Sequence, residues 1–134
     1  MIEFFIPMKL PTKTHQEKKV RVVKGKPCFY EPAELEAVRV RFRDALAAYV
    51  PDAPMKGAVR LLTKWCFPIS GKHTDGEYRT SKPDTDNLVK MLKDVMTDLH
   101  FWKDDAQVAS EIIEKFWARI PGLYVAVEQI GGTP

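Results

Sequence analysis

Residues 82–108 read KPDTDNLVKMLKDVMTDLHFWKDDAQV, and this stretch joins a strongly patterned helix to two acidic segments. Apolar residues recur in it at the spacing of one helix face, namely at Leu88, Met91, Leu92, Val95 and Leu99. At about 100° per residue, this spacing predicts a helix over 85–99 with a buried apolar face. The roughly opposite face carries Asp86, Lys90, Lys93 and Thr97. The helix is therefore expected to hold charged side chains outside the core.

The segments before this helix predict four strands and another helix. A strand is expected over 2–6, and a hairpin over 19–30 that turns at Gly25. A helix begins near Pro32 and ends before Pro51, since proline suits a first helical turn and cannot continue a helix. Its apolar face consists of Leu35, Val38, Phe42, Leu46 and Tyr49. Residues 57–67 alternate between apolar and charged side chains, which is the period of a half-buried strand.

Downstream, two strands are expected over 107–119 and 123–130, joined by a Pro121-Gly122 turn. Residues 70–81 carry glycines and charges without periodicity, and they predict a loop. No internal repeat or linker divides the chain, so residues 1–134 are expected to form one domain. The order of elements predicts an α/β or α+β fold with one mixed, mostly antiparallel sheet and two helices packed against it.

The composition excludes several classes of protein. The 134 residues carry a net charge of +3 and two cysteines, Cys28 and Cys66, which are far apart. They do not make a disulfide framework, so we expect small buried side chains in a cytoplasmic protein. No apolar run approaches the roughly 20 residues that cross a bilayer, and Met1–Phe5 lacks the basic region of a secretory signal.

The acidic segments suggest a metal site. Asp86 and Lys90 are one helical turn apart, and Asp84 is expected at the junction of loop and helix. Asp104 and Asp105 directly precede a strand. If that strand lies beside the start of the helix, three carboxylates converge, and a divalent cation relieves their repulsion. Hard oxygen ligands favour Mg²⁺, with Mn²⁺ as the alternative.

Structural explanations exist for each acid taken alone. Asp84 fits an N-cap, Asp86 and Lys90 fit a surface ion pair, and Asp104-Asp105 fits a turn. Two other motifs are excluded by spacing. A calcium-binding EF-hand loop that begins at Asp84 would need a glycine and a glutamate where valines stand, and the histidines and cysteines show no zinc spacing.

Together the two segments resemble the RusA family of Holliday junction resolvases. The matching pattern is Asp84-x-Asp86-Asn87-Leu88-x-Lys90, then Asp94, then Phe101-Trp102-x-Asp104-Asp105-Ala106-Gln107-Val108. The close match covers about residues 82–110. The family's usual proline-rich segment after the first strand is replaced here by Leu10-Pro11-Thr12-Lys13-Thr14-His15, so DNA contacts of that loop do not transfer.

The resemblance implies an Mg²⁺-dependent endodeoxyribonuclease that resolves four-way DNA junctions by paired symmetric nicks. Asp84, Asp86 and Asp105 are then the catalytic metal ligands, with Asp104 as a further candidate ligand and Lys90 assisting catalysis. The resemblance also implies a homodimer, for which Phe116, Trp117 and Tyr124 are candidate interface residues, although ordinary core packing explains them equally well. A junction-binding module without cleavage and a D-x-D nucleotide-sugar transferase are the alternative functions.

Basic residues concentrate in two stretches of the chain. Such clusters can bind the phosphates of DNA, and a solvated surface is the alternative explanation. The candidate DNA-binding residues are Lys13, His15, Lys18, Lys19, Lys72, Arg79 and Lys82.

Overall fold

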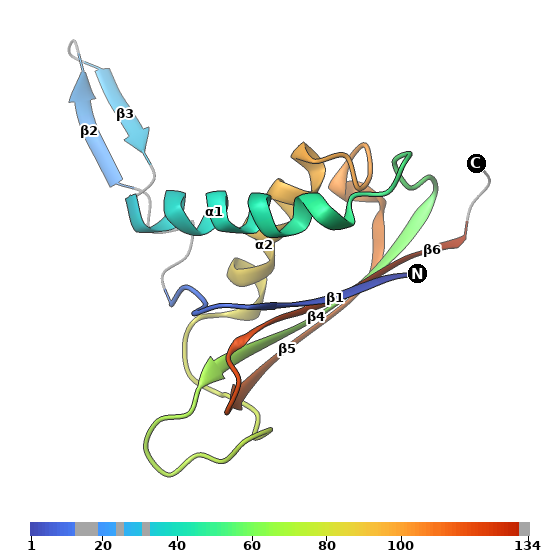
Figure 1. The fold of residues 1–134 in the computed structure, drawn as a ribbon. Coiled ribbons are helices and arrows are strands. Elements are labelled where there is room, and N and C mark those ends of the chain that lie inside the picture. The colour runs from blue at the N-terminus through green and yellow to red at the C-terminus, as the bar shows by residue number, and fades with distance from the viewer. Residues whose placement is uncertain (13–18, 24–25, 31–32, 132–134) are drawn as a thin grey trace.

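The computed structural model describes residues 1–12, 19–23, 26–30 and 33–131 (Figure 1). The elements in chain order are β1 (Ile2–Pro7), β2 (Lys19–Val23), β3 (Lys26–Tyr30), α1 (Ala33–Leu46), the 3₁₀ helix η2 (Ala47–Tyr49), β4 (Ala58–Pro68), α2 (Thr85–Asp98), the 3₁₀ helix η3 (Asp105–Gln107), β5 (Val108–Ala118) and β6 (Gly122–Gly131). The predicted order of strands and helices is confirmed, and the first helix ends earlier than its apolar pattern suggested, in a 3₁₀ turn.

The main sheet has four strands in the order β1-β6-β4-β5. Strand β6 is antiparallel to both β1 and β4, whereas β5 is parallel to β4. Strands β2 and β3 form a separate antiparallel hairpin, whose turn lies outside the described residues. Both helices lie on one side of the main sheet (Figure 1). This mixed sheet with two helices is the α+β fold that the sequence predicts.

Strands β5 and β6 follow each other in the chain but are not neighbours in the sheet, because β4 lies between them. The Pro121-Gly122 connection therefore spans β4 instead of closing a hairpin. Gly122 pairs with Pro7 at the start of β6. A Cβ atom at Gly122 would stand 2.4 Å from the carbonyl oxygen of Ile6, so only glycine permits this close approach of β1.

The core lies between the helices and the inner face of the sheet. Strand β4 contributes Val59, Leu61, Thr63, Trp65 and Phe67, all 0–1% exposed. Phe42 of α1 meets Trp65 edge to face, with ring centroids 6.2 Å apart. Their neighbours on α2 are Leu88, Val89, Met91, Leu92, Val95 and Met96. The alternation of β4 and the helical periodicities thus mark most of the core, but Tyr49, which was expected on the apolar face of the first helix, is 40% exposed.

Cys66 carries a free, half-buried thiol on β4, and burial raises its pKa above the usual value. The side chain of Cys28 lies outside the described part of the structure. Within the described residues, no helix combines the length and apolar character needed to span a bilayer.

Phe42→Ala is expected to lower the free energy of unfolding by about 3–5 kcal/mol, because it leaves a cavity beside Trp65 in a core where Phe42 is fully buried. Val40 on the same helix is 58% exposed, so Val40→Ala is the matched control, with a change within about 0.5 kcal/mol. Urea denaturation measures both. Equal losses would contradict the assigned face of α1.

Candidate active site

Asp84 occupies the N-cap position of α2. Its backbone is extended, with φ −74° and ψ 146°, and its carbonyl accepts the first helical bond from the N–H of Leu88. Its carboxylate makes no capping hydrogen bond. An aspartate at this position usually caps the helix with its side chain. N-capping therefore explains the position of Asp84 but gives no role to its carboxylate. This carboxylate remains available to bind another group.

Asp86 and Lys90 lie one turn apart on the exposed face of α2. They do not form the surface ion pair that their spacing allows. Among the described residues, neither side chain has a hydrogen-bond or ion-pair partner. Both charges are thus accessible to a bound ion or phosphate.

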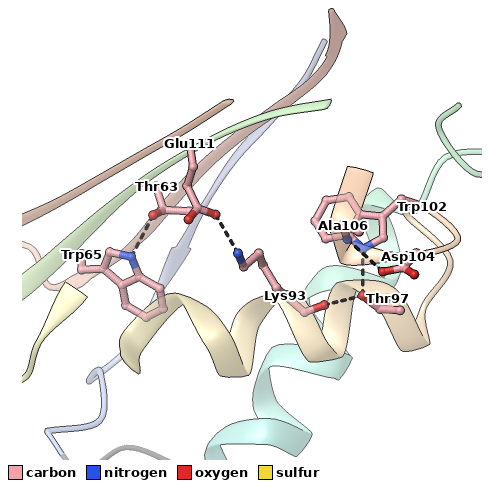
Figure 2. Close-up of polar contacts among 8 residues, drawn as sticks. All are labelled: Thr63, Trp65, Lys93, Thr97, Trp102, Asp104, Ala106 and Glu111. Carbon is pink, nitrogen blue, oxygen red and sulfur yellow. Dashed lines mark hydrogen bonds and ion pairs between the residues drawn. The ribbon is translucent and has the colours of Figure 1, made fainter. Parts of the chain in front are cut away.

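The two acids after α2 differ in their contacts. Asp104 is the N-cap of η3, and its Oδ1 accepts a 2.9 Å hydrogen bond from the N–H of Ala106 (Figure 2). The Gln107 Oε1 accepts in return from the N–H of Asp104 at 3.2 Å, which completes a capping box. Asp105 makes no such bond among the described residues. The turn explanation therefore fits Asp104, whereas Asp105 is the free acid of the pair.

Asp86, Lys90 and Asp105 meet at one hollow of about 260 Å³ between α2, η3 and β5. The other lining residues are Val89, Lys93, Glu111 and Ile113. The structure thus brings together three of the four residues predicted as catalytic. The sequence prediction did not include Lys93 and Glu111, whose side chains form a 3.1 Å ion pair at this hollow (Figure 2).

Asp84 lies just before the hollow, where the chain enters α2. A lysine that the sequence prediction also missed lies beside it. Lys115 Nζ donates to the carbonyl oxygens of Ser81 and Pro83, at 2.7 Å each. Burial and the nearby charge of Arg79 lower the pKa of Lys115, and the negative charge of Asp84 acts in the opposite direction.

A signal for these missed residues exists in the sequence. Glu111 and Lys115 pair in register with Leu61 and Trp65, so they lie on the inner face of β5. Charged residues at inward positions of a strand need partners, and they are therefore candidates for a functional site.

The donor chemistry of the hollow fits a hard divalent cation. Carboxylates are the preferred ligands of Mg²⁺, which is usually held by one or two of them and keeps several waters. Asp86 and Asp105 supply two. Within the described residues, no three histidine, cysteine, aspartate or glutamate side chains stand close enough to hold one ion together. The full convergence of three acids is thus not present in this arrangement, although two of them share the hollow.

The candidate DNA-binding residues have different surroundings. Lys72 and Lys82 are exposed on the loop before α2. The guanidinium of Arg79 packs over the rings of Phe67 and Trp117, at 4.4 and 4.6 Å from their centroids, so it is engaged within the chain. Lys13, His15 and Lys18 lie outside the described residues, and Lys19 begins β2.

The loop over 70–81 covers two of the three candidate interface residues. Trp117 is 7% exposed and stacks on His73 at 4.3 Å, and Phe116 stacks on Tyr78 at 4.8 Å. Backbone hydrogen bonds join the loop to this end of β5. Trp117 is thus a packed residue and not an exposed one. The hydroxyl of the third candidate, Tyr124, donates to Glu3.

Comparisons with known proteins identify the class of this chain. The family model described as Endodeoxyribonuclease RusA matches residues 9–128. The crossover junction endodeoxyribonuclease rusA of Lactococcus phage r1t is 31% identical over 107 residues, which are 75% of this chain and 76% of that protein. The uncharacterized protein YqaN of Bacillus subtilis (strain 168) is 39% identical over 51 residues, 38% of this chain and 35% of that protein.

These matches define an enzyme of the endodeoxyribonuclease class, which acts on phosphodiester bonds of DNA. The chain belongs to the RusA family. The family resemblance of residues 82–110 is thereby confirmed, and the match extends over most of the chain.

The contacts of the two neighbouring acids predict that substitution lowers the free energy of unfolding at Asp104 but not at Asp105. Asp104→Ala is expected to lower the free energy of unfolding by about 1 kcal/mol, because it removes the cap of η3. Asp105→Ala, with no capping bond to lose, is expected to stay within about 0.5 kcal/mol of the wild type. Urea denaturation in a chelator measures both without metal effects. A loss for Asp105→Ala as large as that for Asp104→Ala would refute the assignment.

Proposed function

We propose that this enzyme resolves Holliday junctions, cutting four-way DNA by paired symmetric nicks in recombination and repair. The observation that carries the proposal is the meeting of Asp86, Lys90 and Asp105 at one exposed hollow, with all three charges unpaired among the described residues. The phage relative is named for the same activity on crossover junctions. An accessible groove with acids and a lysine suits the exposed backbone of a large DNA substrate.

In this proposal Asp84, Asp86 and Asp105 hold Mg²⁺, with Mn²⁺ as a substitute. When bound, such an ion supplies an activated water and neutralises charge on the phosphate. The protein orients two of these acids, because α2 carries Asp86 and η3 carries Asp105, whereas Asp84 stands at the N-cap position with its carboxylate free of capping bonds. Asp104 stays with its capping role, so we do not assign it to the metal.

Lys90 faces the same hollow as the two acids and has no carboxylate partner among the described residues. An ammonium group there can stabilise the negative charge that develops on the phosphate oxygens during hydrolysis. Lys93 differs from Lys90, because Glu111 already neutralises its charge at 3.1 Å. We therefore assign Lys90, and not Lys93, to the scissile phosphate.

Two further features complete the proposal. Basic residues contact the DNA backbone, namely Lys13, His15, Lys18, Lys19, Lys72 and Lys82. The enzyme acts in the cytoplasm. The enzyme acts as a homodimer, because a four-way junction needs two opposed nicks, and Asp86, Lys90 and Asp105 meet at a single hollow within the described residues of one chain. Light scattering at micromolar concentration tests the dimer. A monomer that still makes paired nicks on the junction would contradict it.

Asp86→Asn and Asp105→Asn are expected to abolish cleavage of a labelled four-way junction. Each substitution removes a negatively charged oxygen ligand of the metal. The cleavage rate should therefore fall by more than the roughly 10–100-fold that is typical when only a hydrogen-bond partner of a ligand is lost. Junction binding in a chelator should remain equal or become tighter, because negative charge near phosphates is removed. Asp44→Asn, at an exposed position of α1, is the control with unchanged cleavage. Near-normal cutting by either site variant would refute the assignment.

Lys90→Ala is expected to slow cleavage by about 10²–10³-fold, with a smaller effect on junction affinity. Lys90→Arg should restore little activity, since a guanidinium differs from an ammonium in shape and hydration. Single-turnover rates and gel-shift affinities separate the two effects. The control is Lys56→Ala, at an exposed position before β4. A change confined to affinity would show that Lys90 only anchors the DNA.

A further inference from the structure

Three successive backbone carbonyls directly before Asp84 accept hydrogen bonds from cationic side chains. Lys115 Nζ donates to the carbonyls of Ser81 and Pro83, at 2.7 Å each. An Nη of Arg79 donates to the carbonyl of Lys82 at 2.5 Å, and its Nε donates to the Ser81 Oγ at 3.1 Å. We call Lys115 and Arg79 the cationic clamp.

Both members of the cationic clamp are themselves fixed. Lys115 belongs to β5, which is paired along its length with β4. The Arg79 guanidinium is confined over the rings of Phe67 and Trp117. The N–H of Arg79 also donates to the carbonyl of Lys115 at 2.9 Å, so the two residues are joined through the backbone. The clamp therefore ties residues 81–83 to the sheet.

The cationic clamp acts where helix α2 provides no restraint on the Asp84 side chain. The Asp84 carboxylate makes no capping bond, so the path of the chain before the helix decides where this acid stands. Lys115 also brings positive charge close to Asp84, because its Nζ donates to the carbonyl of Pro83, the residue directly before this acid. A carboxylate is held more precisely for a metal when its neighbours are fixed and hydrogen-bonded.

We propose that Lys115 and Arg79 are positioning residues that hold Asp84 in place to bind the divalent cation, a role that rests on the proposed function. Lys115 is not itself a phosphate contact, because two of its three N–H donors are already bonded to carbonyls. Arg79, which the sequence suggested as a DNA contact, instead belongs to this clamp.

Calorimetric titration of the full-length protein with Mn²⁺ alone tests the proposal without requiring cleavage. Lys115→Met is expected to weaken Mn²⁺ binding by about tenfold, within the range for losing a group that orients a ligand. Asp84→Asn should also weaken it. The double variant should bind no more weakly than Asp84→Asn alone, because the clamp acts through Asp84. Lys64→Met is the matched control, since Lys64 is also a half-buried strand lysine, and it should bind Mn²⁺ normally.

Thermal unfolding and gel shifts in a chelator accompany the titration. We expect junction affinity to be unchanged in Lys115→Met. Losses of Mn²⁺ affinity that add in the double variant, or normal Mn²⁺ binding with only a lower melting temperature, would overturn the clamp. Absence of Mn²⁺ binding by the wild type would overturn it as well. If Lys115→Met does not fold, Arg79→Met is titrated with the same expectations.

The outcomes separate this proposal from the proposed function. A wild type that binds Mn²⁺ through Asp84 and Lys115 but does not cut junctions would refute junction resolution and leave the clamp supported. A wild type that cuts junctions while Lys115→Met binds Mn²⁺ normally would refute the clamp alone.

Discussion

The burial of the apolar face of α2 against the sheet is the constraint on which the site depends. Leu92, Val95 and Met96 are fully buried, and each such side chain contributes roughly 1.5–3 kcal/mol. An exposed ion pair on the same helix contributes at most about 1 kcal/mol, and this limit would apply to Asp86 and Lys90 if they paired. Apolar packing therefore sets the rotation of α2 about its axis, and this rotation places Asp86 and Lys90 at the hollow beside β5.

The parallel pairing of β5 with β4 supplies the other half of the site. It places the inner face of β5 next to the start of α2, and that face carries Glu111 and Lys115 between apolar residues. Glu111 neutralises Lys93 at the hollow, whereas Lys115 binds the chain ahead of Asp84. The edge strand of this sheet is thus both a wall of the core and the support of the proposed metal site.

The sequence predicts most of the fold because its periodicities are strong. The alternation in 57–67 and the helical spacing in 85–99 both mark the buried faces correctly. It could not predict that β4 lies between β5 and β6, because a Pro-Gly turn signal does not specify which strands pair. Local spacing also predicted the positions of Asp84 and Asp86. The division of roles between Asp104 and Asp105 depends on a local capping box with Ala106 and Gln107, which the acidic pair alone does not reveal. The use of Arg79 within the chain depends on contacts with the distant residues Phe67 and Trp117, which local spacing does not encode.

The most direct test of the proposed activity is a comparison of DNA substrates. The purified protein is incubated with a labelled four-way junction, a linear duplex and a flap, with Mg²⁺, with Mn²⁺ and with a chelator. We predict paired symmetric nicks in the junction with either metal, little cutting of the other two substrates, and none in the chelator. Binding of the junction without nicking in both metals and across pH, or equal cutting of the linear duplex, would contradict the assignment as a junction resolvase.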